Sequence, residues 1–443
     1  MGETLPNPSN RASYKRYVMR RLALHKSWVP LLVVALGLVG CAPGVVEPPT
    51  PFPRLDTPKP PTPVQPAVES SAIPEELAEP PEPTATPRVA IPSRPVEEPR
   101  LEVGEPVIIE QIWMDSATDG WAIGSHLDAV PGLPIHVLRT HDGGQTWSEV
   151  TPPEDNLAGI GGIESSGSNA WVIYLGSDRV WRTSDGGATW TASKAGYPEG
   201  QFSTIEFSDA LHGWMLQEVE SGFGSQLVSL FRTADGGDIW QEIINPYESE
   251  DLQSCLKTGM SFFGINAGWV TYDCEGTYLE AFLDVSGDAG ESWTEGQLPT
   301  PDGAAQSTDE GWCYSSSPHQ TGNASGTLIV TCVVDEDSVL SESAYLYSTE
   351  DAGETWNIRD YPGGEPHFFD AKTILALARD QYRSTDSGMS WEKIKTVSWD
   401  GIYSFVNPDR GWAVAVNEDE IALVATSDSG RTWEILRPLI ASE

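Results

Sequence analysis

Positive charge and cysteine are both scarce in this chain. Its 443 residues include 26 Lys and Arg against 65 Asp and Glu, a formal net charge of -39, and only five cysteines. The deficit of positive charge falls on the part from Val107 to Glu443, which holds 15 basic and 53 acidic residues. Because a surface of this sign repels phosphate backbones, binding to nucleic acid is excluded.

The chain also lacks a hydrophobic run long enough to favour a membrane-spanning helix. Its most apolar stretch runs from Trp28 to Gly40 and follows six basic residues between Arg11 and Lys26. That stretch is shorter than the roughly 20 residues that a spanning helix needs. A basic segment, a short apolar run and a small residue before Cys41 are together typical of a secretory signal.

The sequence Leu38-Val39-Gly40-Cys41 resembles the lipobox of bacterial lipoproteins. The resemblance implies that residues 1–40 are a signal peptide and that Cys41 is the lipidated first residue of the mature chain. Acyl chains would then hold the protein to a bacterial membrane, outside the cytoplasm in the cell envelope. A plain signal anchor with an incidental cysteine is the alternative.

Residues 41–106 cannot form a packed domain. Of the 35 prolines in the chain, 19 lie between Pro43 and Pro106, in repeated Pro-Thr-Pro, Pro-Pro and Glu-Pro units. Such units favour extended backbone without internal hydrogen bonds and behave as a semi-rigid spacer of about 3 Å per residue. We therefore expect a disordered stalk over 41–106 and a single folded domain over 107–443.

An internal repeat with the pattern Ser/Thr-x-Asp-x-Gly-x-x-Trp occurs seven times in that domain. Its aspartates are Asp142, Asp185, Asp235, Asp288, Asp351, Asp386 and Asp428. Its tryptophans are Trp147, Trp190, Trp240, Trp293, Trp356, Trp391 and Trp433. Successive aspartates are 35 to 63 residues apart, and such a span is suited to one four-stranded sheet per repeat.

The repeated residues suit a tight turn between two strands. An Asp side chain can accept hydrogen bonds from backbone N–H groups two or three residues ahead. The glycine provides the positive φ that residues with a Cβ resist, and the tryptophan packs against the hairpin that the turn closes. This pattern resembles the Asp-box, or BNR, repeat of sialidases and related propellers. The resemblance implies an all-β fold, a seven-bladed β-propeller almost without helix.

A second repeat marks the strands that come before these turns. Gly-Trp or Ala-Trp pairs place Trp121, Trp171, Trp214, Trp269 and Trp412 about 14 to 23 residues ahead of a turn. We interpret these segments as the second strand of each blade, and we count Trp312 of Gly311-Trp312 with them. Blade 5 is expected to be enlarged around residues 322–343, and the short blade 6 lacks the Gly-Trp pair.

Four of the five cysteines lie in the expected propeller and could form two disulfide bonds. Cys255 and Cys274 are 19 residues apart, as are Cys313 and Cys332, and each pair flanks the expected turn between the first two strands of a blade. Four cysteines allow three pairings. The symmetry of the repeat favours Cys255 with Cys274 and Cys313 with Cys332, and an extracytoplasmic location permits both bonds.

No catalytic or metal-binding residue emerges from the sequence. The repeated aspartates sit in seven equivalent turns, so we expect them to have a structural role. A sialidase would in addition need three arginines that bind the substrate carboxylate, and 15 basic residues leave little room for such a cluster. The seven histidines show no HExxH or His-x-His spacing. We therefore predict a protein that is not an enzyme, with no cofactor and no bound metal.

The single propeller with a lipid anchor resembles the photosystem II assembly and stability factors. Blades of that family have the sequence pattern Gly-Trp-Ala-x-Gly followed by Thr-x-Asp-Gly-Gly-x-Thr-Trp. Blade 1 here follows this pattern from Gly120 to Trp147. The resemblance implies a scaffold or assembly factor that binds protein. The arginine-rich patch that the family presents to its partner cannot be assembled from this sequence. A glycan-binding, sialidase-like or glycoside-hydrolase propeller is the alternative.

The face opposite the repeated turns is expected to bear acidic loops. Loops within blades carry Asp128, Glu218, Glu220, Glu275, Asp335, Glu336, Asp337, Glu342, Glu418, Asp419 and Glu420. Loops between blades carry Glu154, Asp155, Glu199, Glu248, Glu250, Asp251, Asp302 and Glu365. Such a face is either a solvated surface, or one that docks a basic protein or a membrane-complex protein or collects divalent cations. We name Glu418–Glu420 and Asp335–Asp337 as candidate partner-binding residues and expect a monomer.

Overall fold

The computed structural model describes most of the chain from Leu101 onward. The described residues are 101–127, 136–154, 159–198, 200, 202–222, 224–253, 255–274, 281–301, 311–322, 324–336, 339–417 and 420–441. The predicted signal peptide, Cys41 and nearly all of the predicted stalk lie outside them, so these assignments stay predictions.

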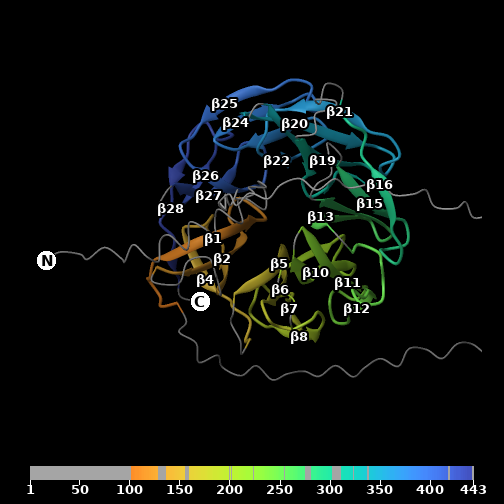
Figure 1. Ribbon diagram of the computed structural model, residues 1–443. Coiled ribbons are helices and arrows are strands. Elements are labelled where there is room, and N and C mark those ends of the chain that lie inside the picture. The colour runs from red at the N-terminus through yellow and green to blue at the C-terminus, as the bar shows by residue number, and fades with distance from the viewer. Residues whose placement is uncertain are drawn as a thin grey trace, which may run out of the picture. The chain divides into compact units, whose positions relative to one another are not determined.

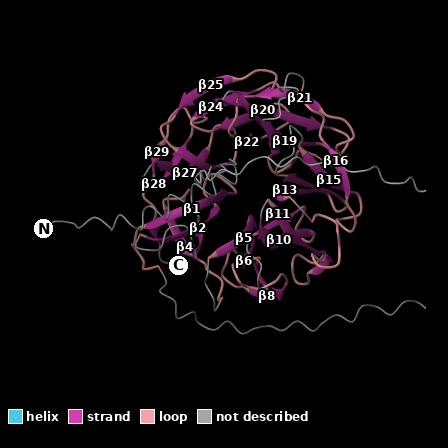
Figure 2. Ribbon diagram, viewed as in Figure 1, coloured by secondary structure: helices cyan, strands magenta, loops and turns pink. Residues whose placement is uncertain are grey.

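Every element of regular structure in the described residues is a β-strand, and the strands form seven sheets (Figure 2). The sheets follow one another around a ring in chain order, and the last lies beside the first (Figure 1). The predicted all-β, seven-bladed propeller is confirmed.

The first four blades are regular four-stranded meanders of antiparallel strands. Blade 1 contains β1 (Val107–Met114), β2 (Gly120–His126), β3 (His136–Thr140) and β4 (Thr146–Glu149). Blade 2 contains β5 (Ile160–Ser166), β6 (Asn169–Tyr174), β7 (Arg179–Thr183) and β8 (Thr191–Lys194). Blade 3 contains β9 (Ser203–Phe207), β10 (Gly213–Gly222), β11 (Ser225–Thr233) and β12 (Gln241–Ile244). Blade 4 contains β13 (Leu256–Phe263), β14 (Ala267–Asp273), β15 (Phe282–Ser286) and β16 (Thr294–Gln297).

The last three blades vary more in size. Blade 5 contains β17 (Gly311–Ser315), β18 (His319–Gln320), β19 (Gly326–Glu336), β20 (Val339–Thr349) and β21 (Asn357–Tyr361). Blade 6 contains β22 (Glu365–Phe368), β23 (Ile374–Leu377), β24 (Asp380–Ser384) and β25 (Glu392–Thr396). Blade 7 contains β26 (Asp400–Phe405), β27 (Gly411–Asn417), β28 (Glu420–Thr426) and β29 (Glu434–Ile435). The expected enlargement of blade 5 is the long β19–β20 hairpin, whose strands have 11 residues each.

A short C-terminal strand closes the ring on blade 1. Strand β30 (Leu439–Ile440) pairs in parallel with β4 and so adds a fifth strand to that sheet. The same strand holds the start of the domain, because Gly104 N donates to Ile440 O at 2.8 Å and Ile440 N donates to Glu105 O at 2.9 Å. Leu101 is buried in the core that blades 1 and 7 share. The two ends of the propeller therefore meet at one blade.

Five tryptophans lie in second strands, as the Gly-Trp repeat predicts, and they pack between neighbouring blades. Their side chains are at most 1% exposed. Four indole N–H groups donate to the carbonyl that follows the aspartate of the next blade's turn, at 2.8 to 3.2 Å: Trp171 to Gly236, Trp214 to Ala289, Trp269 to Ala352, and Trp412 to Gly143. Trp121 instead reaches the Gly167 carbonyl in the β5–β6 turn. These bonds join adjacent blades directly.

The assignment of Trp312 to this series is wrong. Trp312 lies in β17, the first strand of blade 5, and it is only half-buried. The second strand of that blade is β19, where Gly326 faces Thr349 as Gly120 faces Thr140 in blade 1. Thr327 therefore takes the position that tryptophan occupies elsewhere.

Both disulfides form between the cysteines that the repeat symmetry paired. Cys255 bonds Cys274 across the open ends of β13 and β14. Cys313 and Cys332 are direct cross-strand partners in β17 and β19 and are bonded to each other. Two such bonds suit an oxidising environment outside the cytoplasm.

Candidate functional site

Seven turns of one design gather on one face of the propeller. In each turn the residue after the aspartate donates its N–H to a carbonyl in the turn between strands one and two of the same blade, at 2.6 to 3.0 Å. The donor and acceptor pairs are Gly143–Thr118, Gly186–Ser168, Gly236–Leu211, Ala289–Asn266, Ala352–Ala324, Ser387–Lys372 and Ser429–Asp409. Both sets of turns therefore lie on the same side of the ring, which we call the turn face.

Each turn aspartate is held by hydrogen bonds from within its own turn. At Asp351, Oδ1 accepts from Thr349 Oγ1 at 2.6 Å and from Thr355 N at 2.8 Å, and Oδ2 accepts from Thr355 Oγ1 at 2.6 Å. The same three bonds recur at Asp142, Asp185, Asp288, Asp386 and Asp428. Every contact joins residues at most four positions apart, so the local sequence alone is enough to build the turn.

These hydrogen bonds favour the charged form of six aspartates. Hydroxyl donors from Thr349 and Thr355 lower the pKa of Asp351 to about 2. Side-chain hydrogen bonds are likewise the largest cause of the lowered pKa of Asp185, Asp288 and Asp386. At Asp142 and Asp428 burial raises the pKa, but the hydrogen bonds together outweigh it. Carboxylates with these partners are parts of the turn and poor proton donors at neutral pH.

The third turn departs from the other six. Its seventh position holds Ile239 where the others have Ser or Thr, so Asp235 lacks the hydroxyl donor to Oδ2. The Ile239 side chain is 55% exposed on the turn face.

A further feature of the turns is absent from the sequence prediction. The residue directly after the aspartate has a positive φ even where it is not glycine, at Ala289, Ala352, Ser387 and Ser429. The glycine of the pattern follows it, also with positive φ, from 80° to 98° in all seven turns. Alanine and serine in this region cost about 1 kcal/mol each, so the hydrogen bonds of the turn impose the conformation.

Of the six candidate partner-binding residues, only Glu420 is described together with its side chain. Glu420 begins β28 and is exposed, whereas Glu418 and Asp419 lie outside the described residues. Asp335 and Glu336 end β19 in blade 5, their side chains are not described, and Asp337 lies outside. The two sets belong to blades 5 and 7, which blade 6 separates.

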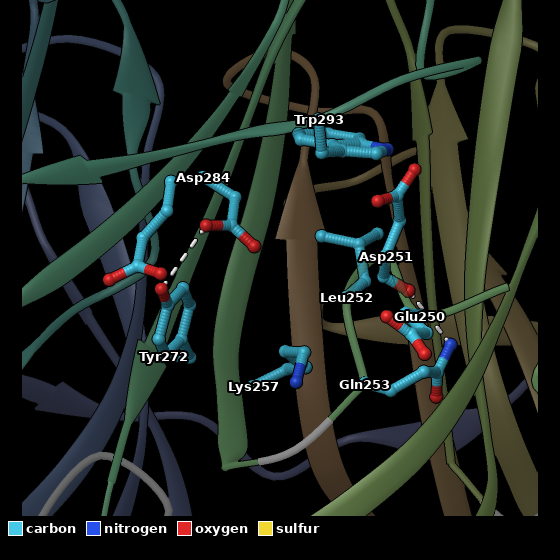
Figure 3. Close-up of a pocket in the computed structure, with 9 residues that line it drawn as sticks. Glu250, Asp251, Leu252, Gln253, Lys257, Tyr272, Asp284 and Trp293 are labelled. Carbon is cyan, nitrogen blue, oxygen red and sulfur yellow. Dashed lines mark hydrogen bonds between the residues drawn. The ribbon is translucent and has the colours of Figure 1, made fainter. Parts of the chain in front are cut away.

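A cavity of about 190 Å³ opens instead between blades 3 and 4 (Figure 3). Its lining residues are Glu250, Asp251, Leu252, Gln253, Lys257, Tyr272, Asp284, Trp293 and Glu295. Lys257 is the second residue of β13 and Tyr272 is the last but one of β14, so both lie near the strand ends remote from the β13–β14 turn. This end of the cavity therefore points toward the face opposite the turn face, which we call the loop face. Acidic inter-blade residues such as Glu250 and Asp251 were expected there.

The connection between β12 and β13 forms one wall of the cavity. Gln253 fixes it to blade 3, because its amide accepts from Val228 N at 3.1 Å and donates to Val228 O at 3.0 Å. Leu252 is buried in the core between the two blades and has a φ of 58°. The wall is thus a fixed part of the fold, and it carries Glu250 and Asp251 beside the cavity.

The opposite wall holds three polar side chains, of which Tyr272 is buried and Lys257 and Asp284 are half-buried. Tyr272 Oη donates to Asp284 Oδ1 at 3.1 Å, and Lys257 Nζ lies 5.5 Å from the centre of the Tyr272 ring. Lys257 also donates to Cys255 O at 3.3 Å, next to the first disulfide. In Figure 3 the Trp293 indole lies at the other end of the cavity from Lys257.

Burial shifts the ionisation of this network. It lowers the pKa of Lys257 to about 8, although the Asp284 carboxylate acts in the opposite direction. Burial also raises the pKa of Asp284, and the charges of Glu295 and Asp251 add to the rise while Tyr272 and Lys257 oppose it. The cavity thus concentrates negative charge where solvent cannot fully screen it.

Three of the nine lining residues stand out in the sequence, but none of them as part of a cavity. Glu250 and Asp251 were among the acidic inter-blade residues, and Trp293 was a turn tryptophan. Lys257, Tyr272 and Asp284 were missed because they lie in three different strands of blade 4 and meet only after the sheet forms. The alternation along β15 gave one weak signal, since Asp284 stands on a strand of otherwise apolar and small residues.

Two carboxyl groups of the inner strands have unusual ionisation as well. Burial raises the pKa of Glu164 in β5 to about 8, and the charges of Glu206 and Asp115 add to the rise. Burial raises the pKa of Glu206 in β9 to about 7, although Ser261 Oγ and Phe262 N donate to its Oε1. A carboxyl group that keeps its proton near neutral pH is a poor cation ligand.

The described part of the chain contains no group of three or more His, Cys, Asp or Glu side chains placed to hold a metal ion. The same residues include no helix with the length and apolar character to cross a membrane.

Comparison with known proteins gives matches in structure but not in sequence. No protein-family model matches the chain, and no curated protein matches it. Among solved structures, YCF48 bound to a D1 peptide has a TM-score of 0.47 at 15% identity, covering 77% of this chain and 99% of that one. A PL25 ulvan lyase has a TM-score of 0.42 at 11% identity, covering 74% of this chain and 96% of that one.

The GH74 enzyme of Niastella koreensis has a TM-score of 0.33 at 14% identity, covering 74% of this chain and 71% of that one. The similar structures thus include a peptide-bound protein and enzymes that act on polysaccharides. At these identities the likeness concerns the propeller fold, and the chain's function has to be argued from its own residues.

Proposed function

We propose that the protein is a non-catalytic, lipid-anchored propeller that binds another protein through its acidic loop face, outside the cytoplasm. The observation that carries this proposal is the cavity between blades 3 and 4, where carboxylates stand beside aromatic rings on a fixed framework. The side chains of Glu250 and Glu295 are exposed, and their carboxylates accept no hydrogen bond from another described residue. Unpaired charges of this kind attract an oppositely charged partner at long range.

The anchor rests on the sequence and on the disulfides. The basic segment, the apolar run and the Leu38–Cys41 sequence support lipidation at Cys41. The bonds Cys255–Cys274 and Cys313–Cys332 support an oxidising compartment. Labelling with a radioactive fatty acid tests the anchor: wild type should take up label and fractionate with membranes, and Cys41→Ser should lose the label.

Pull-down from the native membrane, with salt elution, tests the binding function. A basic partner should be retained at low salt and released as ionic strength rises, because screening weakens attraction between exposed charges. Neutralising Glu418, Asp419 and Glu420 together tests whether this loop takes part. Retention that is unaffected by salt, or the absence of any retained protein, would count against the proposal.

A glycan-binding or glycan-cleaving propeller is the second candidate, and one observation favours it. Asp284 and Glu295 are cross-strand partners in β15 and β16, and the cavity that they line also contains Trp293 and Tyr272. Paired carboxylates beside an aromatic platform are the parts that a glycosidase needs. Turnover of labelled polysaccharides that is lost in both Asp284→Asn and Glu295→Gln would establish this function in place of the scaffold.

A further inference from the structure

The size of the cavity limits what it can hold. Pockets that enclose whole small ligands usually measure about 300 to 1,000 Å³, whereas this one measures about 190 Å³. One long side chain projecting from a partner is therefore a better match than a free ligand.

The charge around the cavity defines the kind of side chain. Glu250, Asp251, Asp284 and Glu295 line it, and Lys257 is the one cationic residue of the lining. No hydrogen bond or ion pair among the described residues uses the side-chain oxygens of Glu250, Asp251 or Glu295. The cavity is thus left with excess negative charge, which a cationic group would neutralise.

The aromatic wall favours a planar cation. An arginine guanidinium stacks on aromatic faces and bonds carboxylates with two parallel N–H groups, whereas a lysine ammonium is a strongly hydrated point charge. This chain itself stacks guanidinium groups on indoles, with Arg139 Cζ 4.6 Å from the centre of the Trp121 ring and Arg410 Cζ 4.7 Å from that of Trp412. Trp293 offers a third indole in the lining of the cavity, and Figure 3 shows the Asp251 carboxylate beside it.

We propose that the cavity between blades 3 and 4 receives an arginine side chain of the protein partner, with the guanidinium between Trp293 and the carboxylates of Asp251 and Glu295. The inference rests on the proposed function and names the chemistry of the contact. Lys257 lies at the other end of the cavity, held by the Cys255 carbonyl. The positive charge of Lys257 repels the guanidinium and so limits the affinity, whereas the carboxylates of Asp251 and Glu295 attract it.

Blocked tripeptides test this site directly on the full-length chain in detergent micelles. The probes are acetyl-Gly-Arg-Gly-amide, the same peptide with lysine, and the same peptide with citrulline, which keeps the shape of arginine but has no charge. Titration calorimetry or ligand-observed NMR measures Kd. The arginine peptide should bind about tenfold more tightly than the citrulline peptide and several-fold more tightly than the lysine peptide.

Four variants assign the contact to the cavity. Glu295→Gln should weaken binding of the arginine peptide about fivefold and Trp293→Leu by a similar factor, whereas Lys257→Met should strengthen it about threefold. Glu434→Gln is the matched control, because it removes the same charge from an exposed site on the outer strand of blade 7 and should leave Kd unchanged. Glu295 is itself exposed, so its substitution leaves the fold intact.

Equal binding of the arginine and citrulline peptides would overturn the inference, and so would equal effects of Glu295→Gln and Glu434→Gln. Equal binding of arginine and lysine would overturn the assignment to guanidinium. The outcome also separates this inference from the proposed function. If wild type and Glu295→Gln retain a partner equally, the scaffold function is supported and the arginine pocket is refuted. If the arginine peptide binds as expected but no partner is retained, the arginine pocket is supported and the scaffold function is refuted.

Discussion

The carboxylates of the turn face and those of the cavity between blades 3 and 4 differ in the hydrogen bonds that they accept. Six turn aspartates each accept at least three bonds from their own turn, and their pKa values are lowered. The side-chain carboxylates of Glu250, Asp251 and Glu295 accept none from the described residues, and the pKa of nearby Asp284 is raised. We infer from this difference that the turn aspartates stabilise the fold and that the cavity carboxylates are available to a partner.

Acid should lower the free energy of unfolding more than any substitution below, because it protonates all six turn aspartates whose pKa is lowered. A carboxyl group with a lowered pKa in the folded state adds stability above its unfolded value near 3.9, and that stability is lost as the pH falls through the folded value. For Asp351 the folded value is about 2. We expect the free energy of unfolding to fall steeply between about pH 4 and pH 2, as measured by circular dichroism in denaturant. A free energy of unfolding that stays constant over this pH range would contradict the stabilising role of the turn aspartates.

Loss of a tryptophan that joins two blades should have the next largest effect. Trp412 is fully buried and donates to the Gly143 carbonyl in the first turn, where blade 7 meets blade 1. Trp412→Ala should lower the free energy of unfolding by about 4 kcal/mol, as measured by chemical denaturation. The half-buried Trp312 is the control, and Trp312→Ala should cost clearly less. Equal losses would show that the turn face does not hold the ring together.

Completing the third turn should have the smallest effect on stability, and of the opposite sign. Ile239→Thr would supply the hydroxyl that Asp235 Oδ2 lacks and would remove an exposed apolar side chain. We expect a gain of about 1 kcal/mol, measured as a rise in the denaturation midpoint. Ile239→Val, which brings no hydroxyl, should give no gain. If Val and Thr behave alike, the hydroxyl bond is not the source of stability in the other six turns.

The same contrast explains what could be predicted from the sequence. The turns were predictable because Thr349, Asp351 and Thr355 interact within seven residues of chain, and the pattern recurs seven times. The disulfides were predictable because their spacing repeats in consecutive blades. These features depend on local sequence or on the symmetry of the repeat.

Features that depend on one particular contact were not predictable. The closing strand β30 has two residues and no pattern, and its position depends on pairing with β4. Trp312 was misplaced because Thr327 replaces the marker tryptophan in the true second strand of blade 5. The cavity is lined by Lys257 and Asp284 from two strands and by Trp293 from the turn before β16, a combination that no spacing in the sequence reveals.

One paired measurement tests the division between structural and available carboxylates most directly. Asp142→Asn and Glu295→Gln remove one negative charge each, and both proteins can be assayed for unfolding free energy and for affinity to the arginine peptide. We predict that Asp142→Asn costs roughly 2 kcal/mol and leaves the affinity unchanged. Glu295→Gln should leave the stability unchanged and weaken the affinity about fivefold. A similar loss of stability in both variants, with no loss of affinity in Glu295→Gln, would contradict the account.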